Sequence, residues 1–407
     1  MQFLRRLSLS RLLALCAAVV IVGAAGTALA SSIGGASPPA AQPLAQAIHA
    51  ALSAPQVQGV SAQITFTNSL LDGASLQSAG SSGLLSGANP LMGGASGRLW
   101  ASGGEVRLEL QSAHGDDEIV DDGHQIELYE TASNNLYRYR LPGGSSTSGS
   151  GGGRSVPTVA HIANLLSHLS RHHLLSGATP GVTAGQPSYT VRVTPRQDGG
   201  LFGGVALSWD AARGVPLALD LYATGNASPV LSLRATSISY GPVSPSVFAL
   251  DPPDPIVHDV TVGAGGGRTA SGARDRQAPV TGASAVGGKA PFALHAPVTL
   301  SGQSLDQVRL VHLHGRPGAL LTYGHGLGGL AILEQAAGAP SLLPTTTSTT
   351  DPNSSLGVLP HVDVDGVSAS ELAAALGTLL SWTTDGIQYT LLGSVPKATA
   401  VQAANGF

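Results

Sequence analysis

The chain has 407 residues, of which only 11% are charged, and its formal net charge is −4. This sparse, slightly acidic charge excludes the recruitment of nucleic acid by bulk electrostatics. The length is sufficient for two domains of ordinary size. Cys16 is the single cysteine, so the chain beyond its N-terminal segment is expected to fold without disulfide bonds.

Residues 1–30 have the pattern of a secretory signal peptide, with cleavage expected after Ala30. A basic start and an apolar run precede small residues at the cleavage positions: Arg5, Arg6 and Arg11, then Leu12–Ala25, then Ala28-Leu29-Ala30. An uncleaved signal anchor is the alternative, and lipid attachment at Cys16 is disfavoured because Leu15 precedes it. We expect an exported, extracytoplasmic protein that is peripheral to the membrane, with a tether over residues 31–42.

Residues 43–255 are predicted to form a mainly antiparallel β domain with helices. Helices are predicted over Pro43–Ser53 and Thr158–Leu175, from apolar residues at helical spacing. Period-two alternation predicts the strands. They begin around Val60–Phe66 and continue at Gly97–Ser102, Glu105–Ser112, Glu118–Asp121, Gln125–Glu130, Leu136–Leu141, Ser188–Pro195, Gly204–Asp210, Val215–Ala223 and Val230–Tyr240.

Two segments of this domain depart from regular structure. Leu70–Gly97 is a long loop with seven apolar side chains of leucine and methionine, so we expect it to pack on the sheet or to cover a cavity. Gly143–Gly153 is a Gly/Ser tract, which is typical of a flexible insertion.

Residues 256–294 are predicted to be a flexible linker, because they lack apolar periodicity, and residues 295–407 a smaller α+β domain. Ser368 with Glu371 three residues later resembles a capping box, which predicts a helix over Ser368–Leu380. The remaining predicted elements are strands at Val308–His314, Gly318–Tyr323, Gly329–Glu334, Val358–Val364 and Ile387–Leu392, a loop at Pro340–Ser355 and a helix at Pro396–Ala404.

The order of motifs in the first domain resembles the LolA-like lipoprotein carriers and the N-terminal domain of the MucB/RseB family. The motifs are Asp121–His124, Leu128-Tyr129 and Leu136–Arg138 in one hairpin, then Ala206–Arg213 with Val215–Leu217, then Ser239–Phe248 with Pro252-Pro253. The resemblance implies a half-open β-barrel with a helical lid that binds the acyl chains of a lipid or lipoprotein.

The second domain resembles the C-terminal module of the MucB/RseB family. Its motifs are Leu320–Gly324, Gly366–Ser368, Leu379–Trp382 and Tyr389–Gly393. This resemblance implies an envelope-stress sensor that binds an anti-sigma factor through the second domain. The chain departs from the family by its few aromatic residues and by the insertions at Gly143–Gly153 and Ser341–Ser355. Its 54 glycines and few lysines are typical of a high-GC bacterium, such as an actinobacterium.

A candidate lipid site combines the apolar side of the second predicted helix with leucines of the long loop. We expect these residues to line the mouth of the barrel: Ile162, Leu165, Leu166 and Leu169 from the helix, and Leu84, Leu85 and Leu91 from the loop. Few large aromatic residues are present to fill a barrel, which favours a cavity. An ordinary packed core is the alternative.

Other motifs do not predict chemistry. Gly324–Gly329 matches a dinucleotide-binding pattern but lacks the following helix and acid, so it is interpreted as a glycine-rich hairpin. The acidic run Asp116-Asp117-Glu118 is interpreted as a solvated turn rather than a cation site. Histidines such as His312 and His314 lack metal-site spacing. We expect that the protein is not an enzyme and that it binds no cofactor or metal. The competing functions are those of a carrier, a sensor and a hydrolase with an active site that no sequence motif marks.

Overall fold

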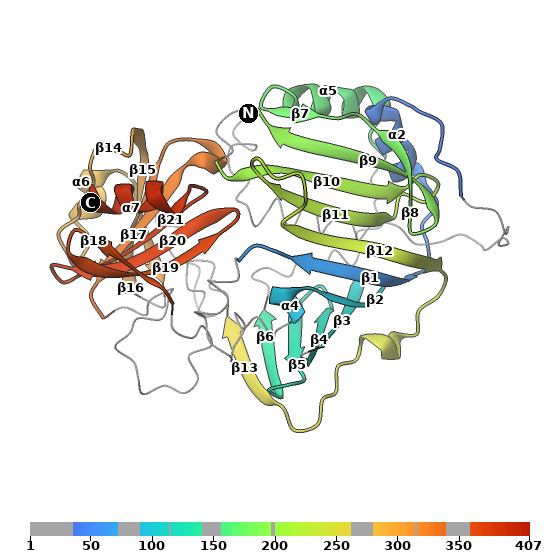
Figure 1. Cartoon of the computed structure of the whole chain (residues 1–407), viewed down its shortest axis with the longest axis horizontal. Helices are drawn as coiled ribbons and strands as arrows, with labels where there is room; N and C mark the ends of the chain where they lie inside the picture. The colour runs from blue at the N-terminus through green and yellow to red at the C-terminus, as the bar shows by residue number, and fades with distance from the viewer. Residues whose placement is uncertain are drawn as a thin grey trace, which may run out of the picture.

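The computed structural model describes residues 36–71, 90–113, 115–140, 156–196, 200–261, 280–313, 316–338 and 359–407. Within these ranges the chain forms two separate sheets with short helices packed on them (Figure 1). Several predictions lie outside the described residues: the signal peptide over residues 1–30, Leu84 and Leu85, the Gly143–Gly153 insertion, the Pro340–Ser355 loop and His314.

The first sheet has 13 strands in the order β13-β6-β5-β4-β3-β2-β1-β12-β11-β10-β9-β7, with β8 paired to β9. Its pairs are antiparallel, except that β13 runs parallel to β6. The strands are β1 Val60–Asn68, β2 Ala95–Ser102, β3 Glu105–Ser112, β4 Gly115–Asp121, β5 Gln125–Glu130, β6 Asn135–Arg140, β7 His173–Leu175, β8 Thr179–Thr183, β9 Gln186–Pro195, β10 Phe202–Asp210, β11 Pro216–Ala223, β12 Leu231–Tyr240 and β13 Ile256–Thr261.

The predicted alternation is confirmed in this sheet. In β1, Val60, Ala62 and Ile64 are buried, whereas Gln63 and Thr65 are exposed. The predicted hairpin is also confirmed, because β5 pairs with β6 from Gln125↔Arg140 to Glu130↔Asn135. Mainly antiparallel β structure with few helices is therefore the fold class of the first unit.

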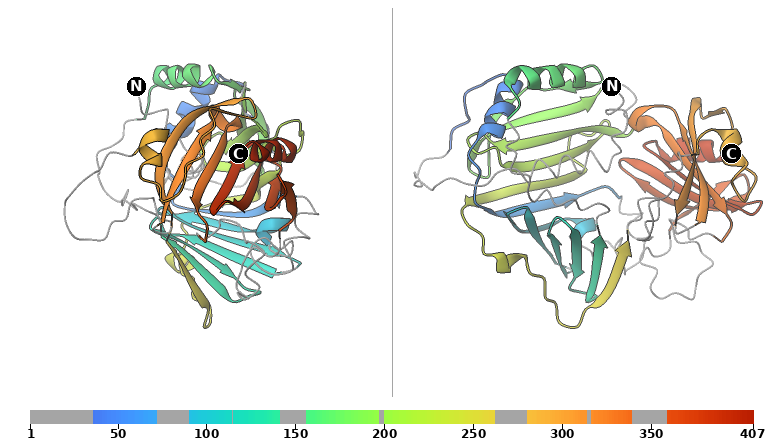
Figure 2. Two further views of the ribbon diagram at one scale, coloured as in Figure 1. Left: turned by 90° about the vertical axis from the view of Figure 1, so that its left-hand side faces the viewer. Right: turned by 180° about the vertical axis from the view of Figure 1, so that it is seen from behind.

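The sheet curls through a half barrel, and short helices pack on one of its sides (Figures 1 and 2). Helices α2 (Leu44–Ser53) and α5 (Val159–Leu169) lie together near β9. Helix α4 (Pro90–Gly93) lies against β1, β3 and β4. Ala47 of α2 packs with Tyr189 of β9 and Trp209 of β10, which fixes α2 on the sheet.

The opposite side of the half barrel is crossed by residues 241–255, which connect β12 to β13 (Figure 1). This segment contains the 3-10 helix η3 (Pro245–Phe248), whose Phe248 is buried. Arg107 of β3 donates from Nη1 to the carbonyl oxygens of Val247 and Ala249, at 2.9 and 3.1 Å. These hydrogen bonds hold the segment on the sheet and bring β13 beside β6.

The second sheet has eight strands in the order β14-β15-β16-β17-β21-β20-β19-β18. Val286 of α6 (Ala283–Gly287) is buried in its core, as are Ala400, Ala403 and Ala404 of α7 (Lys397–Asn405). The strands are β14 Thr299–Leu300, β15 Gln303–Leu313, β16 Arg316–Tyr323, β17 Leu330–Ala336, β18 His361–Val364, β19 Val367–Ala374, β20 Gly377–Thr384 and β21 Ile387–Gly393. Gly324–Gly329, which includes the 3-10 helix η4 (Gly326–Gly328), connects β16 to its antiparallel partner β17, as a hairpin requires.

Backbone hydrogen bonds join the two units at hairpin tips. The N–H of Leu201, before β10, donates to the carbonyl oxygen of Ser394 at 2.9 Å, directly after β21. The N–H of Ala375, in the β19–β20 turn, donates to the carbonyl oxygen of Leu70 at 2.7 Å. The N–H of Leu201 also donates to the hydroxyl oxygen of Ser394 at 3.1 Å.

The predicted helix over Ser368–Leu380 is wrong, because this segment forms β19 and β20. Ser368 pairs with Asp363 of β18, and Leu372 pairs with Leu379 across the hairpin. Glu371 does not cap a helix; its buried carboxylate pairs with Lys397 of α7 at 2.6 Å. Pairing on both sides of β19 overrides the helix propensity of its Ala and Leu residues.

Two predicted boundaries are also wrong. The helix predicted over Thr158–Leu175 ends at Leu169, and His173–Leu175 becomes β7 on the edge of the first sheet. The predicted linker begins at residue 256, but Ile256–Thr261 is a strand of the first sheet. At its other end, Val286 belongs to the core of the second sheet. Tertiary contacts order both ends of a segment that lacks apolar periodicity.

A close approach between β2 and β3 gives a first prediction. A Cβ atom at Gly97 would collide with the carbonyl oxygen of Glu109 and lie 3.2 Å from Cα of Leu110. We expect Gly97→Ala to lower the free energy of unfolding by roughly 1–3 kcal/mol in urea denaturation, because overpacking forces the strands apart. The exposed neighbour Ser96, changed to Ala, should have little effect. Equal stability of the two variants would contradict the close approach.

Candidate functional site

One side of the first sheet carries its apolar side chains, and α2 and α4 pack against it; we call this side the apolar face. Side chains alternate along a strand and align with their cross-strand partners, so apolar residues gather in rows across the sheet. One row, the leucine row, crosses β10, β11, β12 and β1 through Leu207, Leu219, Leu233 and Phe66. A second row crosses β1 to β5 through Ala62, Leu99, Leu108, Ile119 and Leu128.

The leucine row is incompletely covered. All four of its side chains are only half-buried, whereas Ala206 and Ala218, on the opposite side of the same strands, are buried. This reverses the usual preference for leucine in the most buried positions. The row crosses four strands that lie about 4.8 Å apart, so it is about 14 Å long. Such a strip suits an elongated apolar ligand.

The side opposite the apolar face is polar and largely neutralised by ion pairs. Arg107 pairs with Glu118 at 2.6 Å, between β3 and β4. Arg234 pairs with the buried carboxylate of Asp220 at 2.6 Å, between β12 and β11. The sheet is therefore amphipathic, and these ion pairs face away from the leucine row.

The apolar face also contains two buried carboxyl groups beside α4. Asp117 of β4 pairs in register with Leu110 of β3 and Glu130 of β5, so the three side chains share the face. Asp117 is 3% exposed and Glu130 is 6% exposed. The interpretation of Asp116-Asp117-Glu118 as a solvated turn is therefore wrong: the run lies within β4, and strand alternation directs its middle residue inward.

Burial, together with the neighbouring charges of Glu130 and Asp116, raises the pKa of Asp117 to about 7. The N–H of Leu91 in α4 donates to this carboxyl group and opposes the shift. The hydroxyl of Ser133 donates to Oε2 of Glu130 at 2.9 Å. In the described part of the chain, no cluster of three or more His, Cys, Asp or Glu residues could hold a metal ion.

The predicted lipid-site residues lie at two different places in the first unit. On α5, Ile162 is buried and Leu166 is half-buried, whereas Leu165 and Leu169 are 51% and 40% exposed. Helix α5 packs against α2 near β9. Leu91 lies on α4, where it packs against the cluster of Val60, Ala62, Ile64, Leu110 and Ala235. The lipid role of all these residues stays a prediction.

The strand residues of the leucine row were absent from the predicted site. Their alternation was visible in the sequence, because Leu207, Leu219 and Leu233 each lie in a predicted strand. Nothing local in the sequence shows which strands are neighbours or how they align. The row arises only when the register of β10, β11, β12 and β1 is known.

Comparison with known proteins gives distant structural matches only. No protein family profile and no curated protein matches the chain. MucB in complex with MucA(peri) aligns at 16% identity over 89% of this chain and 94% of that chain, with a TM-score of 0.39. The MucA/MucB complex of Pseudomonas aeruginosa gives 17% identity, the same coverage and a TM-score of 0.38. A putative outer membrane lipoprotein-sorting protein domain from Vibrio parahaemolyticus aligns at 10% identity over 50% of this chain and 94% of that chain. Its TM-score is 0.19.

These matches include the families that the sequence motifs resemble, yet their TM-scores are too low to carry an argument about function. Among the described residues, no helix has the length and apolarity needed to cross a membrane.

The buried carboxyl group of Asp117 gives a second prediction. Its pKa in the folded state, about 7, lies above the ordinary value of 3.8. The folded state therefore holds a proton that the unfolded state releases, and stability falls as pH rises from about 4 to about 7. Asp117→Asn removes this loss and keeps an acceptor for the N–H of Leu91. We expect its free energy of unfolding, relative to wild type, to rise by roughly 2–4 kcal/mol between pH 4.5 and pH 8.

The matched control is Asp116→Asn, because Asp116 is the exposed neighbour on the same strand. Its stability relative to wild type should change much less over the same pH range, because the charge of Asp116 is the smallest of the causes that raise the pKa of Asp117. Urea denaturation of all three proteins at both pH values measures the effect. A parallel pH dependence of wild type and Asp117→Asn would contradict the burial of an acid at this position.

Proposed function

We propose that the chain is an exported, non-catalytic protein that binds acyl chains of a lipid or lipoprotein on the apolar face of its first sheet. The observation that supports this most is the half-buried leucine row of Leu207, Leu219, Leu233 and Phe66. A chain lying along the row would remove apolar surface from water at about 25 cal/mol per Å². The proposed role is that of a carrier or chaperone.

In this proposal, α2 and α5 form the movable cover over one end of the row. Leu207 packs beside α2 through the cluster that contains Ala47, and α5 packs on α2 in turn. Leu165 and Leu169 of α5 are exposed, so a ligand would gain further apolar contact if α5 turned toward it. An apolar ligand gives this movement a driving force, since it buries side chains that water now contacts.

A third prediction tests this site by displacement of a fluorescent fatty acid. Leu219→Gln lies in the middle of the leucine row, and burial of one leucine contributes about 1.5–3 kcal/mol. We expect the probe to bind about tenfold more weakly, or worse, to this variant. Leu165→Asp, on an exposed position of α5, should weaken binding without threatening the fold.

Leu392→Gln is the matched control, because Leu392 is an exposed leucine on β21 of the second unit. It should bind the probe like wild type. Circular dichroism of each variant separates loss of binding from loss of fold. Absence of probe binding by the wild-type protein would mean that the apolar face is only a packed core.

A sensor is the second candidate function, with the second unit binding an anti-sigma factor. It is favoured by the construction of the second unit, which has its own core of strands, α6 and α7. Its backbone joins the first unit after β21, where the carbonyl oxygen of Ser394 accepts from the N–H of Leu201. Titration of the full chain with the extracytoplasmic segment of an anti-sigma factor from the same organism tests this. Binding that is unaffected by Leu219→Gln would assign recognition to the second unit.

A further inference from the structure

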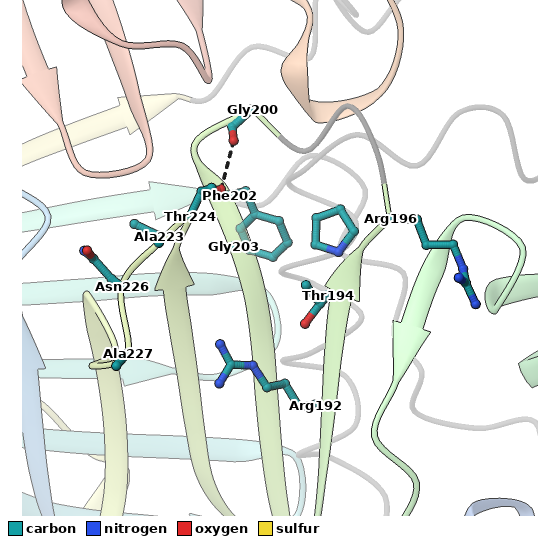
Figure 3. Close-up of a pocket in the computed structure, with 12 residues that line it drawn as sticks. Arg192, Thr194, Arg196, Gly200, Phe202, Gly203, Ala223, Thr224, Asn226 and Ala227 are labelled. Carbon is teal, nitrogen blue, oxygen red and sulfur yellow. Dashed lines mark hydrogen bonds between the residues drawn. The ribbon is translucent and has the colours of Figure 1, made fainter.

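A cavity of about 560 Å³ lies on the polar side of the first sheet, opposite the apolar face. It lies where residues 200–203, at the start of β10, come close to residues 223–227, which follow β11 (Figure 3). Arg192 and Thr194 are two residues apart on β9 and share this side, whereas Val191 faces α2. Phe202, Gly203, Thr224 and Asn226 form much of the remaining wall.

Arg192 is the unusual residue of this cavity. Its guanidinium carbon lies 4.0 Å from the ring centroid of Tyr222, which fixes the side chain over β10 and β11. Five other arginines of the first sheet or its hairpins pair with carboxylates: Arg98, Arg107, Arg138, Arg213 and Arg234. In the part of the chain that the structure describes, Arg192 has no such ion pair. Tyr222 holds its charge in place, and none of the described residues supplies a counter-ion.

The other groups of the cavity are suited to an anion with several oxygen atoms. Thr194 lines it from β9 and Asn226 from the β11–β12 connection, both carry side-chain donors, and none of its described lining residues is a carboxylate. Figure 3 shows Arg192 extending from β9 across β10, whereas Arg196 extends away from the other labelled residues. Arg196 Nε donates instead to the carbonyl oxygen of Ser170 at 3.0 Å. A guanidinium group matches phosphate oxygens in geometry and in charge.

We propose that this cavity binds a phosphate-bearing group, with Arg192 as the residue that carries its recognition. The volume lies within the range of sites for small organic molecules. It therefore leaves room for a phosphate and a small attached group against the ring of Phe202. The site lies on the opposite side of the sheet from the leucine row, so it is independent of the proposed acyl-chain function.

The wall of this cavity is also part of the joint with the second unit. The hydroxyl of Thr224 donates to the carbonyl oxygen of Gly200 at 2.9 Å, as drawn in Figure 3. The adjacent N–H of Leu201 donates to the carbonyl oxygen of Ser394. A phosphate group in the cavity would thus lie beside the hairpin tip that holds the second unit.

Isothermal titration of the full chain with inorganic phosphate, with glycerol 3-phosphate and with phosphatidylglycerol vesicles tests the proposal. Arg192→Gln should weaken binding of glycerol 3-phosphate at least tenfold. Arg196→Gln removes the same charge from a side chain that points away, and should bind like wild type. Asn226 lies in an exposed turn, and Asn226→Ala should weaken binding of glycerol 3-phosphate about threefold. This second variant tests the site if Arg192→Gln fails to fold.

Arg192-dependent binding of the vesicles as well would assign the phosphate to a lipid headgroup, and binding of the small molecules alone would assign it to a free ligand. Either result supports the site. Absence of binding by wild type to all three probes would overturn it. Equal loss in Arg192→Gln and Arg196→Gln, or equally tight binding of acetate, would also overturn it, because only unspecific attraction would then remain.

Discussion

The structure of the first unit depends on the pairing of β1 with two strands from distant parts of the chain. β1 (Val60–Asn68) lies between β2 and β12, so it joins two antiparallel halves into one sheet. Its register with β12 places Phe66 beside Leu233 and Ile64 beside Ala235. A shift of one residue would move these side chains to the opposite side, since side chains alternate along a strand. The leucine row exists only in the observed register.

This pairing divides the sheet into sides with different roles. On the apolar face, leucines from four strands form a strip that the described helices cover incompletely. On the polar side, arginines and carboxylates pair across neighbouring strands, as Arg107 does with Glu118. Arg192 lies beside a cavity and has no ion pair among the described residues, and Asp117 departs from the apolar character of the other side. Residues that depart from an otherwise consistent pattern are expected at functional sites.

Much of the first sheet could be predicted from the sequence, because strands such as β1 alternate between buried and exposed side chains. Gln125–Glu130 and Asn135–Arg140 form the hairpin that was predicted from alternation and a turn. The second unit was harder, since β19 and β20 are rich in Ala and Leu and carry a spacing typical of a helix cap. There, pairing with β18 and β21 decides the structure. β13 shows no alternation of its own and is a strand because η3 and Arg107 bring it beside β6.

The sequence predicts that the candidate site is apolar, but it does not predict which residues form it. Apolar residues on α5 and in the long loop indicated a site for acyl chains, but they could not show that Leu207, Leu219 and Leu233 are cross-strand neighbours. Asp117 was placed in a turn because acidic runs are usually solvated. Its burial follows from the register that aligns it with Leu110 and Glu130. Local sequence patterns do not show which distant strands pair with one another.

Native mass spectrometry of the full chain, purified gently from an expressing bacterium, tests the central claim most directly. The account predicts a second population of the protein, heavier by the mass of one lipid or acylated peptide, and reduced in the Leu219→Gln variant. A single population at the mass of the polypeptide, in wild type and variant alike and after incubation with fatty acid, would contradict it.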